Sequence, residues 1–90
     1  MKKTIVTVLG KDRVGIIAKV CTYLSQNNIN ILDIAQTIVD GFFNMMMVVD
    51  TSASSKEQER IKEELVEIGK ELDVQIQAQN EEIFNMMHRL

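Results

Sequence analysis

The chain has 90 residues, of which 46% are hydrophobic and 26% are charged. This balance is typical of one small globular domain and excludes a disordered or fibrous chain. A net charge of −3, with no Trp and one Tyr, argues against direct nucleic-acid binding, which needs basic groups for phosphates and aromatic rings for bases. No apolar stretch approaches the ~20 residues of a membrane-spanning helix. We therefore expect a single soluble domain over residues 1–90, with no membrane and no nucleic acid among its partners.

The first third of the chain predicts a strand followed by a helix. The β-branched run from Ile5 to Leu9 ends at Gly10, which is typical of a buried strand closed by a turn. Apolar residues then recur at helical spacing and predict one buried stripe: Ile17, Val20, Cys21 and Leu24. Asn27 and Asn28 end this helix in the prediction, and Cys21 is assigned to core packing.

The middle of the chain predicts a β-hairpin. Ile31 to Val39 is rich in Ile, Val and Thr, and Phe42 to Val49 is the returning strand. Between them, Asp40 and Gly41 form a dipeptide that is preferred in two-residue hairpin turns. The methionines at 45–47 are interpreted as packing residues rather than as metal ligands.

The last third predicts a helix, a strand and a short helix. Ser54 and Glu57 match a capping box that opens a helix. The buried stripe of this helix is spaced by three and four residues: Ile61, Leu65, Ile68 and Leu72. Over residues 74–79 apolar residues alternate with Gln, which predicts a half-buried strand. Residues 80–90 predict a short amphipathic helix with Asn80 as its cap.

The predicted order of elements is βαββαβ, which gives an α+β, ferredoxin-like sandwich. In this fold a four-stranded antiparallel sheet carries two helices on one face, and here a short C-terminal helix follows. Both alternating sets of side chains in the strand over 42–49 are apolar, so the second face of the sheet also needs cover. A second copy of the chain is the simplest cover, and we expect a homodimer.

Residues 9–37 read LGKDRVGIIAKVCTYLSQNNINILDIAQT. This segment resembles the signature of the ACT domain, which joins a strand end, an Asp-Arg-x-Gly-Ile loop, a helix with this stripe, and an Asn-Ile pair that opens the next strand. The C-terminal IFNMMHRL, with no catalytic domain attached, resembles a family of short free-standing bacterial ACT-domain proteins. More distantly, the chain is similar to one half of the glycine cleavage system transcriptional repressor.

The resemblance implies a ligand site at a subunit interface. In ACT proteins the sheets pair edge to edge through the second strand, and amino acids bind at that interface. Carried onto this chain, the ligand-binding residues are Asp12, Arg13, Val14, Gly15 and Ile16 of one subunit and Asn30, Ile31 and Leu32 of the other. Free N–H groups at a helix N-terminus suit a carboxylate, and the amide of Asn30 can donate and accept at once. Val14 departs from the family pattern, because most members have Pro there and a more rigid loop.

Each candidate residue also has a structural interpretation that the sequence leaves open. Gly15 is also explained as a turn glycine, Asp12 as the cap of the first helix, and Arg13 as a solvated surface charge. Asn30 is also explained as a turn residue that starts a strand. His88 has no second ligand nearby in the sequence and is interpreted as structural or exposed.

The chain offers no paired catalytic arrangement, so we expect a protein that is not an enzyme and needs no cofactor. Cys21 is the single cysteine, which excludes an intrachain disulfide and a thiol-rich metal site and fits a reducing cytoplasm. Two functions stay open. The first is a small-molecule-binding regulatory domain that senses an amino acid through a homodimer interface. The second is a ligand-free interaction or dimerisation module that acts on a regulatory or metabolic partner protein.

Overall fold

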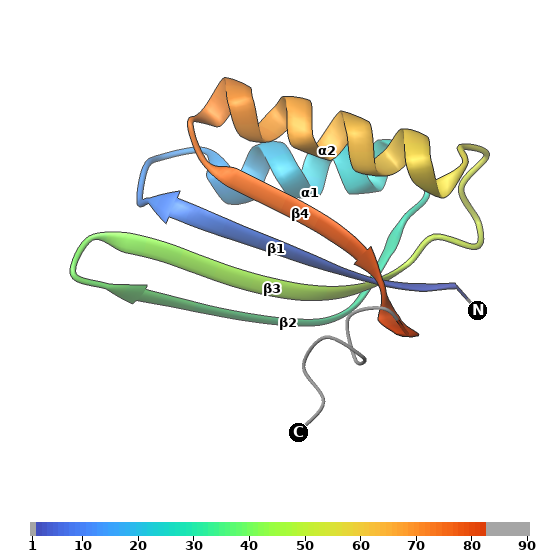
Figure 1. Ribbon diagram of the computed structural model, residues 1–90, viewed down its shortest axis with the longest axis horizontal. Helices are drawn as coiled ribbons and strands as arrows, with labels where there is room; N and C mark the ends of the chain where they lie inside the picture. Colours follow the sequence, from blue (N-terminus) through green and yellow to red (C-terminus); the bar gives the residue numbers. More distant parts are fainter. Residues whose placement is uncertain (1, 83–90) are drawn as a thin grey trace.

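The computed structural model describes residues 2–82 of the chain. The elements of this part have the following bounds: β1 Lys3–Lys11, α1 Ile16–Gln26, β2 Asn30–Val39, β3 Phe42–Asp50, α2 Gln58–Leu72 and β4 Gln75–Asn80. The strands form one antiparallel sheet in the order β2-β3-β1-β4. Figure 1 shows both helices on one face of this sheet. The predicted ferredoxin-like βαββαβ fold is therefore confirmed.

The core lies between the helices and the two central strands. Val6 and Val8 of β1 are fully buried, and they lie opposite Met47 and Met45 of β3. Met46 points to the other face of the sheet and is 43% exposed. The packing role predicted for the methionines is thus confirmed for the two that face the helices.

Helix α1 is rotated by one residue from its predicted orientation. Its buried residues are Ile16, Val20 and Leu24, whereas Ile17 is 40% exposed and Cys21 is only half-buried. The predicted stripe was wrong at these two positions because the helix begins at Ile16, and two adjacent isoleucines offer two alternative stripes. The predicted end was correct, since α1 stops at Gln26 and Asn27 is its C-cap.

The β2–β3 hairpin forms as the sequence predicts. Asp40 and Gly41 have φ of 53° and 79°, the left-handed pair that a two-residue turn of this kind requires. The N–H of Asp12 donates to the carbonyl of Gly41 over 2.9 Å. This bond ties the hairpin turn to the loop that follows β1.

Strand β1 does not end at Gly10 as predicted but continues to Lys11. A Cβ at Gly10 would lie 2.7 Å from Cγ1 of Val74. The glycine therefore allows the close approach of the α2–β4 connection rather than a turn.

Helix α2 begins later than predicted, at Gln58, and its N-cap Glu57 makes no side-chain bond. The predicted capping box is wrong, because Oγ of Ser54 accepts from the N–H of Lys56 over 3.2 Å and closes a turn before the helix. The predicted stripe is confirmed, with Ile61, Leu65 and Ile68 buried. Neither described helix is long and apolar enough to span a membrane.

Strand β4 alternates as predicted, with Ile76 buried between the exposed Gln75 and Gln77. Oδ1 of Asn80 accepts from the N–H of Glu82 over 2.8 Å, in line with its predicted capping role. The rest of the predicted C-terminal helix, like His88, lies outside the described residues.

Candidate functional site

The loop over residues 12–15 connects β1 to α1 at one end of the sheet (Figure 1). Gly15 occupies the N-cap position of α1 with φ of 96°, a conformation that side chains rarely adopt. A Cβ at Gly15 would meet nothing within 4 Å. The glycine is therefore needed for the backbone angle, and the space in front of it is open to a ligand.

The first turn of α1 presents backbone N–H groups that no side chain caps. Its N-cap makes no side-chain hydrogen bond, and its first turn contains no acidic residue. The interpretation of Asp12 as the helix cap is thus wrong, because Gly15 takes that position. The open N-terminus of a helix favours an anion such as a carboxylate.

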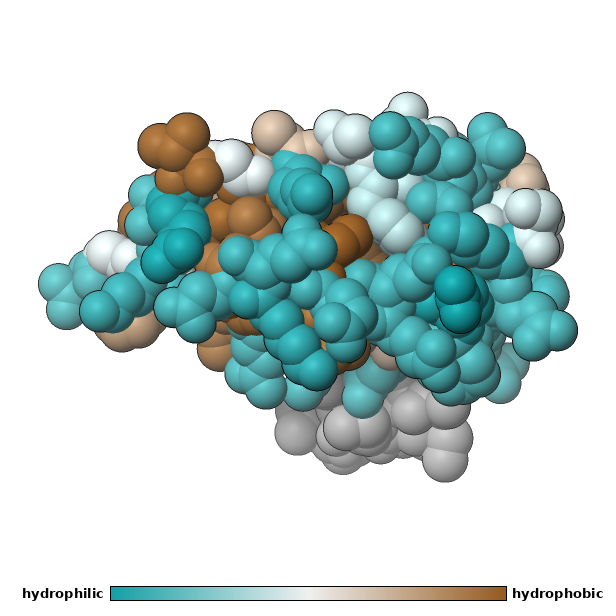
Figure 2. Space-filling model, turned by 90° about the horizontal axis from the view of Figure 1, so that it is seen from above, coloured by the Kyte–Doolittle hydropathy of each residue, from teal (hydrophilic) through white to brown (hydrophobic). Residues whose placement is uncertain are grey.

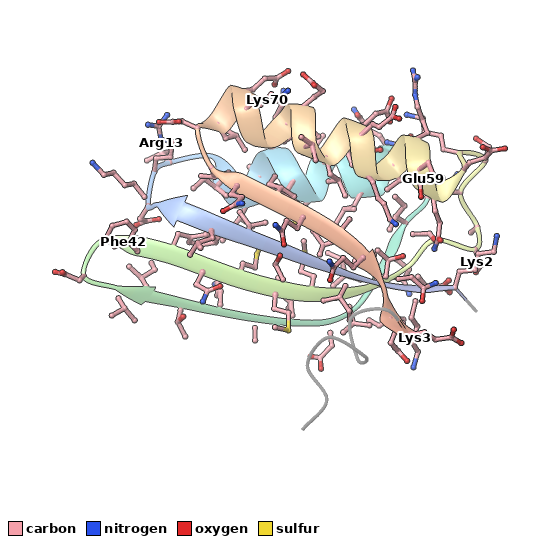
Figure 3. The ribbon with its side chains drawn as sticks, in the orientation of Figure 1. Lys2, Lys3, Arg13, Phe42, Glu59 and Lys70 are labelled. Atoms are coloured by element: carbon pink, nitrogen blue, oxygen red, sulfur yellow. The ribbon has the colours of Figure 1, made fainter. Side chains whose placement is uncertain are left out.

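Arg13 and Val14 differ in how the loop presents them. The guanidinium of Arg13 lies 3.8 Å from a carboxylate oxygen of Asp73, and the two side chains are 49% and 87% exposed. Figure 3 places Arg13 at the same end of the molecule as the α2–β4 turn. Val14 is fully exposed, so its apolar side chain is available to an interface.

The second group of predicted residues lies at the other end of β2. Asn30 is exposed and opens β2 opposite Asp50, Ile31 packs against the core, and Leu32 is 39% exposed at a register shift. Helix α1 separates this group from Gly15, and its 11 residues span ~16 Å. A single chain therefore does not bring the two halves of the predicted ligand site together.

A cleft of about 690 Å³ opens beside Asn30, and the sequence did not predict it. It is lined by Cys21, Leu24, Ser25, Asn28, Ile29, Asn30, Ile31 and Ala53. The cleft lies where the C-terminal half of α1 meets the start of β2 and the loop after β3. Cys21 is therefore a wall of this cleft and not only a core residue.

Strand β2 is an edge of the sheet and carries exposed apolar side chains. Ile31 is its half-buried residue, and the rest of the strand is exposed. Large apolar residues with 39–68% exposure gather on β2 and its hairpin: Leu32, Ile34, Ile38, Val39, Phe42 and Met46. Figure 2 views the molecule from above, over the helices, so that β2 lies on the far side; the hydrophobic surface visible on this face lies in the left half of the view. A long apolar edge of this kind is a pairing surface.

A sequence model of the ACT domain matches residues 2–79. The chain belongs to the ACT domain family. It is 54% identical over 90 residues to a UPF0237 protein of Bifidobacterium longum, with both chains covered in full. It is 38% identical to an ACT domain protein from Streptococcus pneumoniae, with a TM-score of 0.81 and coverage of 92% of this chain and 93% of that one.

A structure named as a glycine cleavage system transcriptional repressor has the same fold at 24% identity, with a TM-score of 0.78. That match covers 88% of this chain and 45% of the other, in line with the predicted similarity to one half of such a repressor. The resemblance read from residues 9–37 is confirmed. Membership of the ACT family makes this chain a small-molecule-binding regulatory domain.

The ionisable cluster of this ACT domain joins its two helices. The hydroxyl of Tyr23 donates to Glu64 over 2.7 Å, and Lys56 and Arg60 also pair with Glu64. Hydrogen bonds from Lys56 and Tyr23 hold the pKa of Glu64 below its ordinary value, whereas burial and Glu64 raise the pKa of Tyr23. Both shifts stabilise the charge states present at neutral pH, so the cluster fixes α1 to α2. Among residues 2–82, no group of His, Cys, Asp or Glu could hold a metal ion.

Proposed function

We propose that the chain forms a homodimer that senses an amino acid at two shared sites. The observation that carries this proposal is the separation of the predicted site residues to the two ends of the free β2 edge. Pairing β2 with β2 of a second copy in antiparallel fashion exchanges these ends. The Gly15 loop of one subunit then meets Asn30 of the other.

The geometry of the β2 edge supports this pairing. The bond between Asp12 and Gly41 keeps the loop at the hairpin end of β2. A twofold axis near Gln36 would place Asp33 opposite Val39 of the other copy, with Asn30 beyond that position. Burial of the apolar β2 residues would stabilise the pair by the hydrophobic effect.

Each residue has a defined task in the proposed site. The first N–H groups of α1 bind the carboxylate of the ligand. The carboxylate of Asp12 accepts from its ammonium group, and Asn30 of the other subunit donates and accepts across the interface. Arg13 can serve as a second carboxylate partner once it leaves Asp73.

Occupancy of the two sites changes the stability of the dimer or the shape of a surface that a regulatory or metabolic protein binds. In this proposal the protein is not an enzyme, and it works in the cytoplasm. The second candidate is a ligand-free interaction or dimerisation module. It is favoured by Phe42 and Ile38, whose exposed side chains suit a protein contact without any ligand.

The test is a thermal-shift screen of the twenty amino acids at millimolar concentration. A ligand at a hundredfold excess over its dissociation constant should stabilise the protein by about 2.7 kcal/mol. Asn30→Ala should abolish this shift while sedimentation still reports a dimer, and Asn44→Ala, at another exposed strand position, should leave it unchanged. Gly15→Val should also abolish it, provided that the variant folds despite the strained backbone angle.

The proposed function fails if no amino acid raises the melting temperature. In that case a dimer that persists in sedimentation would favour the ligand-free module.

A further inference from the structure

The cleft beside Asn30 has an unusual lining for the surface of a chain with 26% charged residues. None of its lining residues is charged. Leu24 and Ile29 are 1% and 5% exposed, so they close the floor of the cleft, and its apolar wall comes from the half-buried Cys21 and Ile31. Two small side chains line the cleft from different elements: Cys21 of α1 and Ala53 of the loop after β3.

Polar side chains stand at the rim of this cleft. Within residues 2–82, the side chains of Ser25, Asn28 and Asn30 make no hydrogen bond to another described residue. Small-molecule sites combine apolar surface with a few placed polar groups, and this open cleft offers both. A volume of about 690 Å³ lies within the range of such sites.

We propose that this cleft takes the side chain of the amino acid held at Asn30, and that it selects uncharged, aliphatic side chains. This inference rests on the proposed function and names the class of ligand. Burial of an aliphatic side chain against Cys21, Ile31 and Ala53 is favourable. A carboxylate or ammonium group would lose water without a counter-charge, because no charged residue lines the cleft.

Cys21 and Ala53 are the specificity-determining residues in this proposal. Both side chains are small, and both lie at the cleft. A larger side chain at either position would take up the space that the ligand needs. Smaller amino acids would then lose less affinity than larger ones.

The thermal-shift screen first tests the ligand class, and alkylation of Cys21, the single cysteine of the chain, then tests where the ligand binds.

In the thermal-shift screen, leucine, isoleucine, valine and methionine should stabilise the protein more than alanine or glycine, and aspartate and lysine should not stabilise it. Leucine at tenfold excess over its dissociation constant should then slow alkylation of Cys21 by iodoacetamide about tenfold, in proportion to the free fraction.

The control for alkylation places the single thiol at another position of helix α1. In the double variant Cys21→Ala and Ala18→Cys, the thiol stands at an exposed position outside the cleft. Leucine should leave the alkylation rate of this variant unchanged.

The second test fills the cleft. Cys21→Met should weaken leucine binding about 5- to 160-fold, the range expected when an added side chain overpacks the space that a ligand needs. Ala18→Met adds the same side chain to α1 away from the cleft and should leave the affinity within about twofold. The melting temperatures of the unliganded variants check that both fold.

The inference is overturned if a ligand found in the screen neither protects Cys21 nor loses affinity in Cys21→Met. The proposed function would stand in that case, because the thermal shift and its loss in Asn30→Ala do not depend on the cleft. If only charged amino acids stabilise the protein, the inference is again overturned while the proposed function stands. If no amino acid binds, both fall.

Discussion

The two ends of helix α1 differ in whether their unpaired backbone groups are hydrogen-bonded. The N–H groups at the N-terminal end have no side-chain cap, whereas carbonyl groups at the C-terminal end accept hydrogen bonds. At the N-terminal end, Gly15 takes a left-handed conformation, no side chain caps the helix, and Val14 is fully exposed. At the C-terminal end, Nδ2 of Asn27 donates to the carbonyl of Tyr23 over 2.8 Å, and the N–H of Ile29 donates to Leu24 over 2.9 Å. Helix α1 therefore has uncapped backbone N–H groups at its N-terminal end and lies beside an open cleft lined by side chains at its C-terminal end.

The substitution with the largest expected effect tests whether the C-terminal end of α1 contributes to the core. Leu24 is 1% exposed, so Leu24→Ala should lower the free energy of unfolding by about 2–5 kcal/mol. Val14→Ala at the open end should change it by less than about 0.5 kcal/mol. Urea denaturation of both variants measures the contrast. Equal effects would contradict the distinction between the two ends.

An intermediate effect is expected from the left-handed residues at the two ends. Gly15→Ala should destabilise the protein by about 1–2 kcal/mol, because φ of 96° is strained for a side chain. Asn28 has φ of 57°, and Asn tolerates this region, so Asn28→Gly should change stability by less than about 1 kcal/mol. A Gly15→Ala variant as stable as the wild type would show that the loop takes another conformation in solution.

The smallest expected effect concerns the hydrogen bond between Tyr23 in α1 and Glu64 in α2, which joins the two helices. The pKa of Glu64 is lowered from 4.5, first by its hydrogen bond with Lys56. Its stabilising contribution is therefore present above pH 4.5 and is lost as the pH falls through the lowered pKa. Glu64→Gln should flatten the decline of stability below pH 4.5, measured by urea denaturation across pH. Glu63→Gln at the adjacent exposed position is the control, and an equal flattening there would contradict this role for Glu64.

The parts of the fold that could be predicted from the sequence are those in which one residue type is required. Asp40 and Gly41 specify the turn because both positions need a positive φ. Ile61, Leu65 and Ile68 specify the buried face of α2 because charged residues occupy its other faces. The capping box failed because Ser54 satisfies a nearby turn equally well, and only the path of the loop decides between the two.

The ACT resemblance predicts the residues of the candidate site and their division between two subunits, and both stay predictions. The structure agrees with this division in one respect, because the length of α1 separates the Gly15 loop from Asn30 within a single chain. The cleft could not be predicted, because Ala53 and Cys21 are far apart in sequence and meet only after the loop beyond β3 folds back. The rotation of α1 that exposes Cys21 depends on whether Ile16 or Ile17 packs inward, and the two are chemically identical.

The register shift between Ile31 and Asp33 limits how copies of this chain can associate. A β-bulge interrupts the regular spacing of backbone donors and acceptors along an edge. Regular strand pairing along this edge is therefore expected over Asp33 to Val39 and not across the bulge. In the proposed β2–β2 dimer the paired region would end before Asn30, which leaves that residue to contact the Gly15 loop of the other copy rather than a strand.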